Sequence, residues 1–278
     1  MDAPRFLAVG HVVLDRTPRG VRWGGAATYA ALAAARWGVP TALLTAGNRS
    51  PALEGVAVHC KPSPLCTTFE NRYSNGTRLQ RLLGRAAPLE PEDLPTPWKE
   101  AGIVLLAPVA QEVSPSFSGC FDRAILGAAP QGWLRRWTPN GLVHPSPLPD
   151  TFPLTRLHAL IASQEDVDTP TQFARWAEQV PLVVMTRGRE GAVLWERGNA
   201  HLVPTAPVEE VDPTGAGDVF AAIFLLRLWE TGSAWEAALW ASAAGALCVQ
   251  KRGLAGVPTR GQVARLLSSQ AWQGLRKQ

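Results

Sequence analysis

The fold of this chain is decided by the stretch Val211-Asp212-Pro213-Thr214-Gly215-Ala216-Gly217-Asp218, which leads directly into an apolar segment with helical character, Val219 to Trp229. Gly215 and Gly217 allow backbone conformations and close approaches that a side chain would block, so successive N–H groups can converge on one anion. The positive end of the following helix adds to this site, because its macrodipole is equivalent to roughly half a positive charge. The stretch therefore predicts a loop that binds a phosphate or a developing oxyanion.

Asp218 stands beside this predicted anion site. A carboxylate repels phosphate and is a poor choice for binding alone. It does suit the removal of a proton from a hydroxyl that attacks a phosphoryl group. The alternative interpretation is that Asp218 only caps the helix, since Asp is common at helix starts and a lone Gly-x-Gly is a weak signal.

Taken as one unit, the eight residues closely resemble the signature of the ribokinase-like (PfkB) carbohydrate kinases, which include fructokinases, adenosine kinases and inositol kinases. The resemblance implies an α/β fold, a three-layer αβα sandwich with a mostly parallel sheet and a small β lid. It assigns the anion hole to Gly215, Ala216 and Gly217, and it makes Asp218 the catalytic base. ATP and Mg²⁺ are the cofactors that such a kinase uses.

Composition indicates a single globular domain over residues 1–278, with 46% hydrophobic and 18% charged residues. The net charge of +4 is small, and no basic stripe with interleaved aromatic residues predicts a nucleic-acid partner. The apolar start at 6–14 is too short to span a membrane. The four cysteines form no Cys-x-x-Cys pair, so a reduced, cytoplasmic setting is expected. The oligomeric state stays open, a homodimer included.

Apolar runs with strand character recur along the chain, and helical patterns fall between several of them, as expected for a parallel sheet that is covered on both faces. The predicted strands are 6–13, 41–45, 103–107, 124–128, 158–162, 182–186 and 192–196. The predicted helices are 26–37, 170–179, 217–229, 234–249 and 260–267.

One segment breaks this alternation, because residues 67–73 alternate with period two, Asn75-Gly76 suits a tight turn, and 77–83 return. Phe69 and Asn71 share one face of this hairpin. An exposed edge hairpin is one interpretation. The family resemblance favours a lid over the substrate, formed by about 13–23 and 56–84, with Phe69 and Asn71 in contact with the substrate.

The remaining substrate residues are assigned near the N-terminus. Gly24 and Gly25 open the first long helix, either for close helix packing or, by the resemblance, for contact with the substrate and movement of the lid. Asp15 follows the first strand, where it is either a surface turn residue or the acid that holds substrate hydroxyls. Tyr29 replaces the asparagine of ribokinases and is assigned to the substrate pocket. These features look most like the inositol-kinase branch.

Nucleotide contacts are expected from two further segments. The turn with Thr186, Gly188 and Gly191 resembles a family turn that approaches the phosphates or ribose of ATP, although a plain hairpin would look the same. The small residues of the closing segment resemble an adenine slot, or indicate only close packing. The nucleotide-binding set is completed by Thr214, Ala243 and Gly253.

Three charged residues complete the expected site. Arg135 is placed by the resemblance where it neutralises phosphate charge near the substrate, although Ala129 stands where some relatives have an Asp. Asp166 is expected to organise Mg²⁺ through water, with Glu165 as a competitor. Asp212, with Thr214, resembles positions that bind an activating monovalent cation such as K⁺.

The sequence thus predicts an ATP-dependent kinase that phosphorylates a hydroxyl of a small polyol or sugar, with a myo-inositol-like substrate favoured. A kinase of ribose, fructose or a nucleoside in the same family is an alternative. A non-catalytic sugar- or nucleotide-binding relative is another, because the carboxylate expected at Ala129 is missing.

Overall fold

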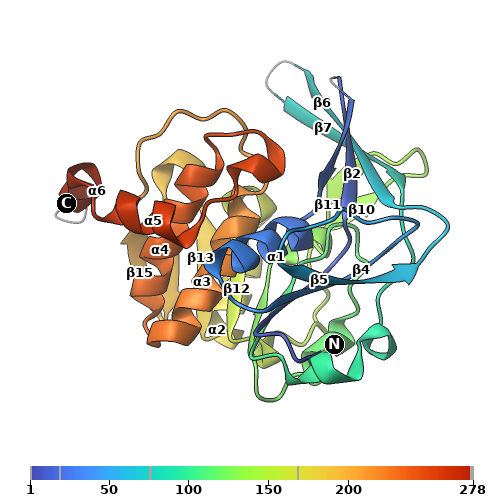
Figure 1. Ribbon diagram of the computed structural model, residues 1–278, viewed down its shortest axis with the longest axis horizontal. Helices are drawn as coiled ribbons and strands as arrows, with labels where there is room; N and C mark the ends of the chain where they lie inside the picture. The colour runs from blue at the N-terminus through green and yellow to red at the C-terminus, as the bar shows by residue number, and fades with distance from the viewer. Residues whose placement is uncertain (1, 19, 75–76, 168, 276–278) are drawn as a thin grey trace.

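The computed structural model of the chain describes residues 2–18, 20–74, 77–167 and 169–275. A nine-stranded sheet forms its centre, with the order β15-β14-β13-β12-β9-β8-β1-β4-β5 (Figure 1). Seven neighbouring strands pair in parallel: β1 (Phe6–Val9), β4 (Thr41–Gly47), β5 (Val56–Pro62), β8 (Ile103–Leu106), β9 (Ile125–Ala128), β12 (Ala159–Ser163) and β13 (Leu182–Thr186). Two antiparallel strands extend one edge: β14 (Ala192–Glu196) and β15 (Asn199–Val203).

Both faces of this sheet are buried. In β1, Phe6 and Ala8 belong to one apolar cluster, while Leu7 and Val9 belong to the other. Because successive side chains of a strand point to opposite faces, two covered faces require a near-continuous apolar run. The layers on either side of a mostly parallel sheet confirm the predicted α/β sandwich.

Helices cover the two faces unequally. The first face carries α1 (Ala26–Trp37), α3 (Ala216–Thr231), α4 (Ala234–Cys248), α5 (Arg260–Leu267) and α6 (Gln270–Leu275). The second face carries one α-helix of the described chain, α2 (Pro170–Gln179), with the short 3₁₀ helices η1 (Pro91–Asp93), η2 (Thr96–Glu100), η3 (Pro115–Gly119) and η5 (Leu154–Arg156). Trp98, Phe117 and Trp176 are fully buried there, so aromatic side chains fill the second layer.

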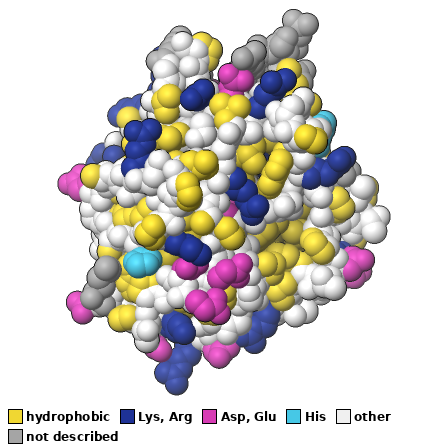
Figure 2. All heavy atoms as spheres, turned by 90° about the vertical axis from the view of Figure 1, so that its right-hand side faces the viewer, with side chains coloured by type: hydrophobic (Ala, Val, Ile, Leu, Met, Phe, Trp, Pro, Cys, Tyr) yellow, Lys and Arg dark blue, Asp and Glu magenta, His cyan; other side chains and the backbone are white. Residues whose placement is uncertain are grey.

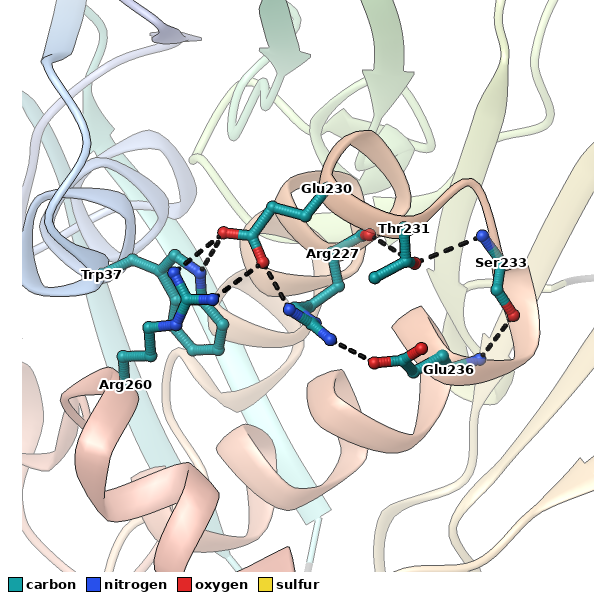
Figure 3. A network of polar contacts seen from close by, with 7 residues as sticks. All are labelled: Trp37, Arg227, Glu230, Thr231, Ser233, Glu236 and Arg260. Carbon is teal, nitrogen blue, oxygen red and sulfur yellow. Dashed lines mark hydrogen bonds and ion pairs between the residues drawn. The ribbon is translucent and has the colours of Figure 1, made fainter.

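A network of charged side chains joins the helices of the first face near the C-terminal end of α3 (Figure 3). Arg227 of α3 donates to Glu230 and to Glu236, which lies on α4. Arg260 of α5 and the indole of Trp37 of α1 also donate to Glu230. Arg227 is 9% exposed, so its charge depends on these partners.

A second, four-stranded sheet stands over one end of the large sheet, at the top right of Figure 1. This small sheet has the order β3-β2-β6-β7 and consists of β2 (Val13–Thr17), β3 (Gly20–Gly24), β6 (Thr67–Ser74) and β7 (Thr77–Gly84). The predicted turn at 75–76 lies outside the described residues. A two-stranded ribbon, β10 (Arg135–Trp137) and β11 (Val143–Pro145), completes the strands.

Two predicted boundaries are wrong. The predicted lid includes residues 56–62, but they form β5, which pairs in parallel with β4 at the edge of the large sheet. The run 6–13 is predicted as one strand, but β1 ends at Val9 and β2 begins at Val13. The chain passes so close to β8 at Gly10 that a Cβ there would lie 2.2 Å from the carbonyl oxygen of Ala107.

The surface carries charges of both signs. On the face shown in Figure 2, acidic and basic side chains are interspersed with apolar ones, so neither sign dominates the described part of this face. No helix within the described ranges is long and apolar enough to cross a membrane.

Candidate active site

The anion loop, residues 211–218, ends in the first turn of α3. Gly215 precedes the helix with a φ of 84°, in the left-handed region that favours glycine. The ring of Tyr29 lies directly beneath it, and a Cβ on Gly215 would lie 2.2 Å from Cδ1 of that ring. Both the backbone conformation and the packing therefore require glycine at this position.

Two backbone N–H groups at the start of α3 face no acceptor in the part of the chain that the structure describes. Among the described residues, the N–H groups of Gly217 and Asp218 have no hydrogen-bond partner, whereas Val219 already donates to the carbonyl of Gly215. Gly217 is exposed, and a Cβ placed on it would meet no atom within 4 Å. Because the sixteen-residue α3 adds its positive end, this position can hold an anion.

Asp218 keeps partial access to solvent although it lies deep in the molecule. The pKa of its carboxyl is raised to about 7, mainly by burial; the positive charge of Arg135 acts in the opposite direction, and the nearby Asp166 carboxylate adds to the rise. A carboxyl with this pKa exchanges its proton near neutral pH, which is the property of a general base that works there.

Asp166 and Arg135 are brought to Asp218 from different elements. Asp166 lies in η6 (Gln164–Asp166), at the carboxyl end of β12, where it accepts from the N–H of Ser163 at 3.1 Å and from the amide of Gln131 at 3.2 Å. Arg135 begins β10, and its guanidinium donates to the carbonyl of Val109 at 3.2 Å. The three charges meet at the carboxyl ends of the parallel strands, where sites in open α/β sheets are found.

The small sheet contributes a buried carboxylate. Asp15 of β2 is 8% exposed, and its Oδ1 accepts from the amide of Asn71 at 3.2 Å. The Asn71 carbonyl oxygen accepts in turn from Gln80 at 3.0 Å. Phe69 pairs with Asp15 in the strand register and lies 5.8 Å from the guanidinium carbon of Arg135. The structure therefore brings Asp15, Asn71, Phe69 and Arg135 to one region.

Gly24 and Gly25 are both required by close contacts. A Cβ on Gly24 would lie 2.3 Å from Oδ2 of Asp15. Gly25 has a φ of 102°, and a Cβ there would lie 2.5 Å from the carbonyl oxygen of His11. The first contact lets the Asp15 carboxylate lie against the backbone before α1, so one glycine serves the site and the other serves the packing.

Tyr29 differs from its predicted role. It is 1% exposed, and its hydroxyl has no hydrogen-bond partner among the described residues. Burial raises the pKa of this hydroxyl. The ring fills the space beneath Gly215, so in this conformation Tyr29 supports the anion loop and does not reach the substrate side.

The predicted nucleotide residues separate into accessible and inaccessible ones. A Cβ placed on Gly188 would meet no atom within 4 Å, and Thr186 is partly exposed. Gly191 is buried, because its Cα faces the carbonyl of Val203, and Ala243 is fully buried in the apolar core. For Gly191 and Ala243 the predicted direct contact is therefore wrong in this conformation.

The N–H groups of Thr214 and Gly253 both donate to the side chain of Asp212. Oδ1 of Asp212 accepts from the N–H of Thr214 at 3.1 Å, and Oδ2 accepts from the N–H of Gly253 at 3.1 Å. Asp212 is 8% exposed. These two predicted nucleotide contacts are thus occupied within the protein, where they shape the turn that precedes Gly215.

The family model of pfkB family carbohydrate kinases matches residues 116–260, which is more than half of the chain. An inositol 3-kinase from Oryza sativa subsp. japonica is 31% identical over 93% of this chain and 71% of its own length. The chain belongs to the pfkB family of carbohydrate kinases. An inositol 3-kinase from Zea mays is 35% identical over 71% of this chain, and the match spans only about half, 55%, of the maize protein.

Solved structures of the ribokinase family share the fold of this pfkB protein. A pyrophosphate-dependent kinase complexed with a pyrophosphate analog and myo-inositol superimposes with a TM-score of 0.78 at 22% identity, over 94% of this chain and 99% of that one. Arabidopsis thaliana ribokinase complexed with ribose and ATP gives 0.74 at 22% identity, over 96% and 99%. These likenesses establish the architecture.

The Asp212 turn, where K⁺ binding was predicted, already holds a positive charge from the protein. Oδ2 of Asp212 accepts from Nη1 of Arg22 at 2.7 Å, in addition to the two backbone N–H groups. A cation that binds this carboxylate would have to displace a guanidinium. No group of three or more His, Cys, Asp or Glu side chains that could hold a metal is present in the described chain.

Two buried residues that support the site, Glu112 and His11, were not predicted from the sequence. Glu112, 1% exposed, accepts from the N–H groups of His11, Val109 and Ala110. The imidazole of His11 bonds to the hydroxyl of Thr67 at 2.7 Å, and burial lowers its pKa. His11 thus ties the small sheet to the large one. The Gly-His pair directly after the first strand was the available signal.

Proposed function

We propose that this chain transfers a phosphoryl group from ATP to a hydroxyl of a small polyol, with Asp218 as the general base. One observation carries the proposal: a carboxyl with a pKa of about 7 lies beside two N–H groups that have no acceptor among the described residues, at the positive end of α3. A helix cap would require neither the raised pKa nor the free donors. A base beside an anion site needs both.

Each residue of the site has its own role in the proposed phosphoryl transfer. Asp15, held by Asn71, accepts hydrogen bonds from substrate hydroxyls and fixes the orientation of the polyol. Asp218 accepts the proton of the attacking hydroxyl. The N–H groups of Gly217 and Asp218 stabilise the negative charge that develops on the transferred group. The small sheet acts as a lid that excludes water, so the phosphoryl group reaches the polyol and is not lost to hydrolysis.

ATP and Mg²⁺ find suitable residues in the same region. Gly188 lies open and Thr186 is partly exposed, so both could contact phosphates. Asp166 would hold Mg²⁺ through water, because its carboxylate is already oriented by Ser163 and Gln131. Bound Mg²⁺ would supply positive charge to the phosphate oxygens. Arg135 adds a fixed positive charge near Asp218.

A myo-inositol-like polyol is the favoured acceptor. The two inositol 3-kinases among the relatives support it, because they match this chain over more of its length than the fructokinases and ribokinases do. The carboxylate of Asp15 is a hydrogen-bond acceptor, which suits a ring that carries neighbouring hydroxyls. A kinase of ribose, fructose or a nucleoside is the alternative within the family.

A second phosphoryl donor, pyrophosphate, is favoured by one observation. Ala243 is fully buried and the N–H of Gly253 is occupied by Asp212, so two expected adenine-side contacts are closed, while Gly217 and Gly188 at the phosphate side are open. Pyrophosphate has no adenine, so it would need only the open phosphate side. A structural neighbour is described as pyrophosphate-dependent.

A product panel tests the function. The chain is incubated with Mg²⁺ and either ATP or pyrophosphate, together with myo-inositol, ribose, fructose or adenosine, and phosphorylated products are measured by ³¹P NMR. We expect a myo-inositol phosphate, and no product from Asp218→Asn. Binding of polyol and donor without any phosphorylated product would establish the non-catalytic alternative.

A further inference from the structure

Arg22 joins the small sheet to the anion loop. It lies on β3, and its Nη1 donates to Oδ2 of Asp212 at 2.7 Å across 190 positions of sequence. Its Nη2 lies 3.4 Å from the hydroxyl oxygen of Thr214. The side chains of Arg22 and Asp212 are 36% and 10% exposed, so the carboxylate end of this pair is shielded from water. This contact links the element over the substrate to the loop that binds the anion.

Asp212 transmits the position of Arg22 to the loop. Its carboxylate fixes the N–H of Thr214, directly before Gly215, and the N–H of Gly253. Burial alone would raise the pKa of Asp212, but hydrogen bonds from Thr214 and Gly253 and the charge of Arg22 together lower it. For Arg22, burial opposes the charge, yet the attraction to Asp212 raises its pKa. Both groups therefore stay charged and hold each other in place.

The strand register places Arg22 beside the substrate clamp. Arg22 pairs directly with Asp15 across the antiparallel strands β2 and β3, so both side chains lie on the same face of the small sheet. The attraction of Asp15 also contributes to the raised pKa of Arg22. The guanidinium thus lies between the carboxylate that would hold the polyol and the one that shapes the anion loop.

We propose that Arg22 is a positioning residue whose guanidinium supplies the positive charge that the Asp212 turn requires, so that the anion loop is correctly shaped only when the small sheet is closed over the site. This proposal rests on the proposed kinase function. It gives the chain a built-in cation where a monovalent metal ion would otherwise bind, and phosphoryl transfer is therefore independent of K⁺. It also couples acceptor binding at Asp15 to donor binding at the loop.

The test compares the wild-type chain with Arg22→Ala, Arg22→Lys and the control Arg16→Ala, because Arg16 is an exposed arginine of the neighbouring strand β2. Two quantities are measured in tetramethylammonium buffer: the affinity for Mg²⁺-pyrophosphate and Mg²⁺-ATP by calorimetry, and turnover of the acceptor found in the product panel. Each is repeated with added KCl and with added guanidinium chloride at low millimolar concentration. Far-ultraviolet circular dichroism checks that every variant is folded.

We expect wild type and Arg16→Ala to bind and turn over equally with and without K⁺. Arg22→Ala loses about 10- to 100-fold in donor affinity and kcat, since a displacement of about 1 Å at the reacting groups costs about 100-fold. Added guanidinium restores part of this loss, and Arg22→Lys keeps more activity than Arg22→Ala. A merely structural contact would give a loss that no added cation repairs.

Three results would overturn the inference: wild-type turnover that requires K⁺, unchanged donor affinity in Arg22→Ala, or a folded Arg22→Ala that neither guanidinium nor lysine rescues. Absence of product from the wild type with every acceptor would instead refute the kinase function, and the donor-affinity measurement would still decide the role of Arg22.

Discussion

Substituting Asp218 by Asn should stabilise the folded chain while it abolishes phosphoryl transfer. The carboxyl of Asp218 has a pKa of about 7 in the folded state against an ordinary value of 3.8, with burial as the main cause. Since one pKa unit corresponds to 1.36 kcal/mol, the charged form of Asp218 costs the folded state about 4 kcal/mol. Asparagine has nearly the same shape and carries no charge, so this cost is removed.

The predicted gain in stability from Asp218→Asn depends on pH. Between pH 4 and 7 the unfolded chain has already released the Asp218 proton, whereas the folded chain still holds it. The unfolded state then binds fewer protons than the folded state, so the contribution of this group to stability falls as pH rises through this window and becomes constant above about pH 8. We expect Asp218→Asn and wild type to unfold with similar free energies at pH 4 and to differ by about 4 kcal/mol at pH 8.

Urea unfolding of both proteins at several pH values measures the difference. Asp122→Asn is the matched control, because Asp122 is 79% exposed and its substitution should change the free energy of unfolding by no more than about 0.5 kcal/mol. In parallel, kcat of Asp218→Asn should fall at least about 100-fold. A difference that is constant between pH 4 and 8, or a less stable Asn variant at pH 8, would refute the reasoning from burial.

Three further outcomes follow from the structure. In pH–rate profiles of the wild type, kcat/KM should rise as pH passes about 7, where Asp218 of the free enzyme loses its proton. A rise centred near pH 4 would contradict the raised pKa. Gly215→Ala should lose thermal stability and activity, because its Cβ would overlap the Tyr29 ring. Gly232 also has a positive φ, 68°, but has open space around it, so Gly232→Ala is the control for backbone strain alone, about 1–2 kcal/mol. Equal losses of stability in both variants would show that contact with Tyr29 adds nothing to the cost. Arg227→Met should lower the free energy of unfolding by about 2–3 kcal/mol, since it leaves the network in Figure 3 without its central cation. KM values should stay unchanged. An unaltered urea midpoint would show that the network adds no stability.

Elements with strong local signals were predictable from the sequence. The helices at 26–37, 170–179 and 260–267 and the strands at 182–186 and 192–196 have the predicted bounds. Thr169 and Thr259 cap their helices through side-chain hydrogen bonds, as hydroxyl residues before a helical pattern predict. Edge strands were missed, because β15 is mostly exposed and β5 only half-buried, so neither carries a continuous apolar run.

The candidate site was predictable where its residues are adjacent and not where they meet through the fold. The anion loop and Asp218 form one local motif, and in the structure two N–H groups at this motif have no partner among the described residues while the pKa of Asp218 is raised. The packing of Tyr29 under Gly215 and the pair of Arg22 with Asp212 join residues nearly two hundred positions apart. Ala243 shows a further limit, since α4 is apolar all round and its sequence does not reveal which small residue faces the ligand.

The position of Asp218 gives the proposed closure of the small sheet a role in the chemistry. From Val219 to Arg227, α3 is buried, and Arg227 and Glu230 anchor its far end, so a shift of the helix that would expose Asp218 further is opposed. If the small sheet acts as the lid proposed above, it controls the access of water to this carboxylate from the side that carries Asp15 and Arg22. Closure of that sheet would then remove water from Asp218 and strengthen it as a base. If Arg22 holds the anion loop only in the closed state, the base is strongest at the moment when the loop is also shaped to bind the transferred phosphoryl group.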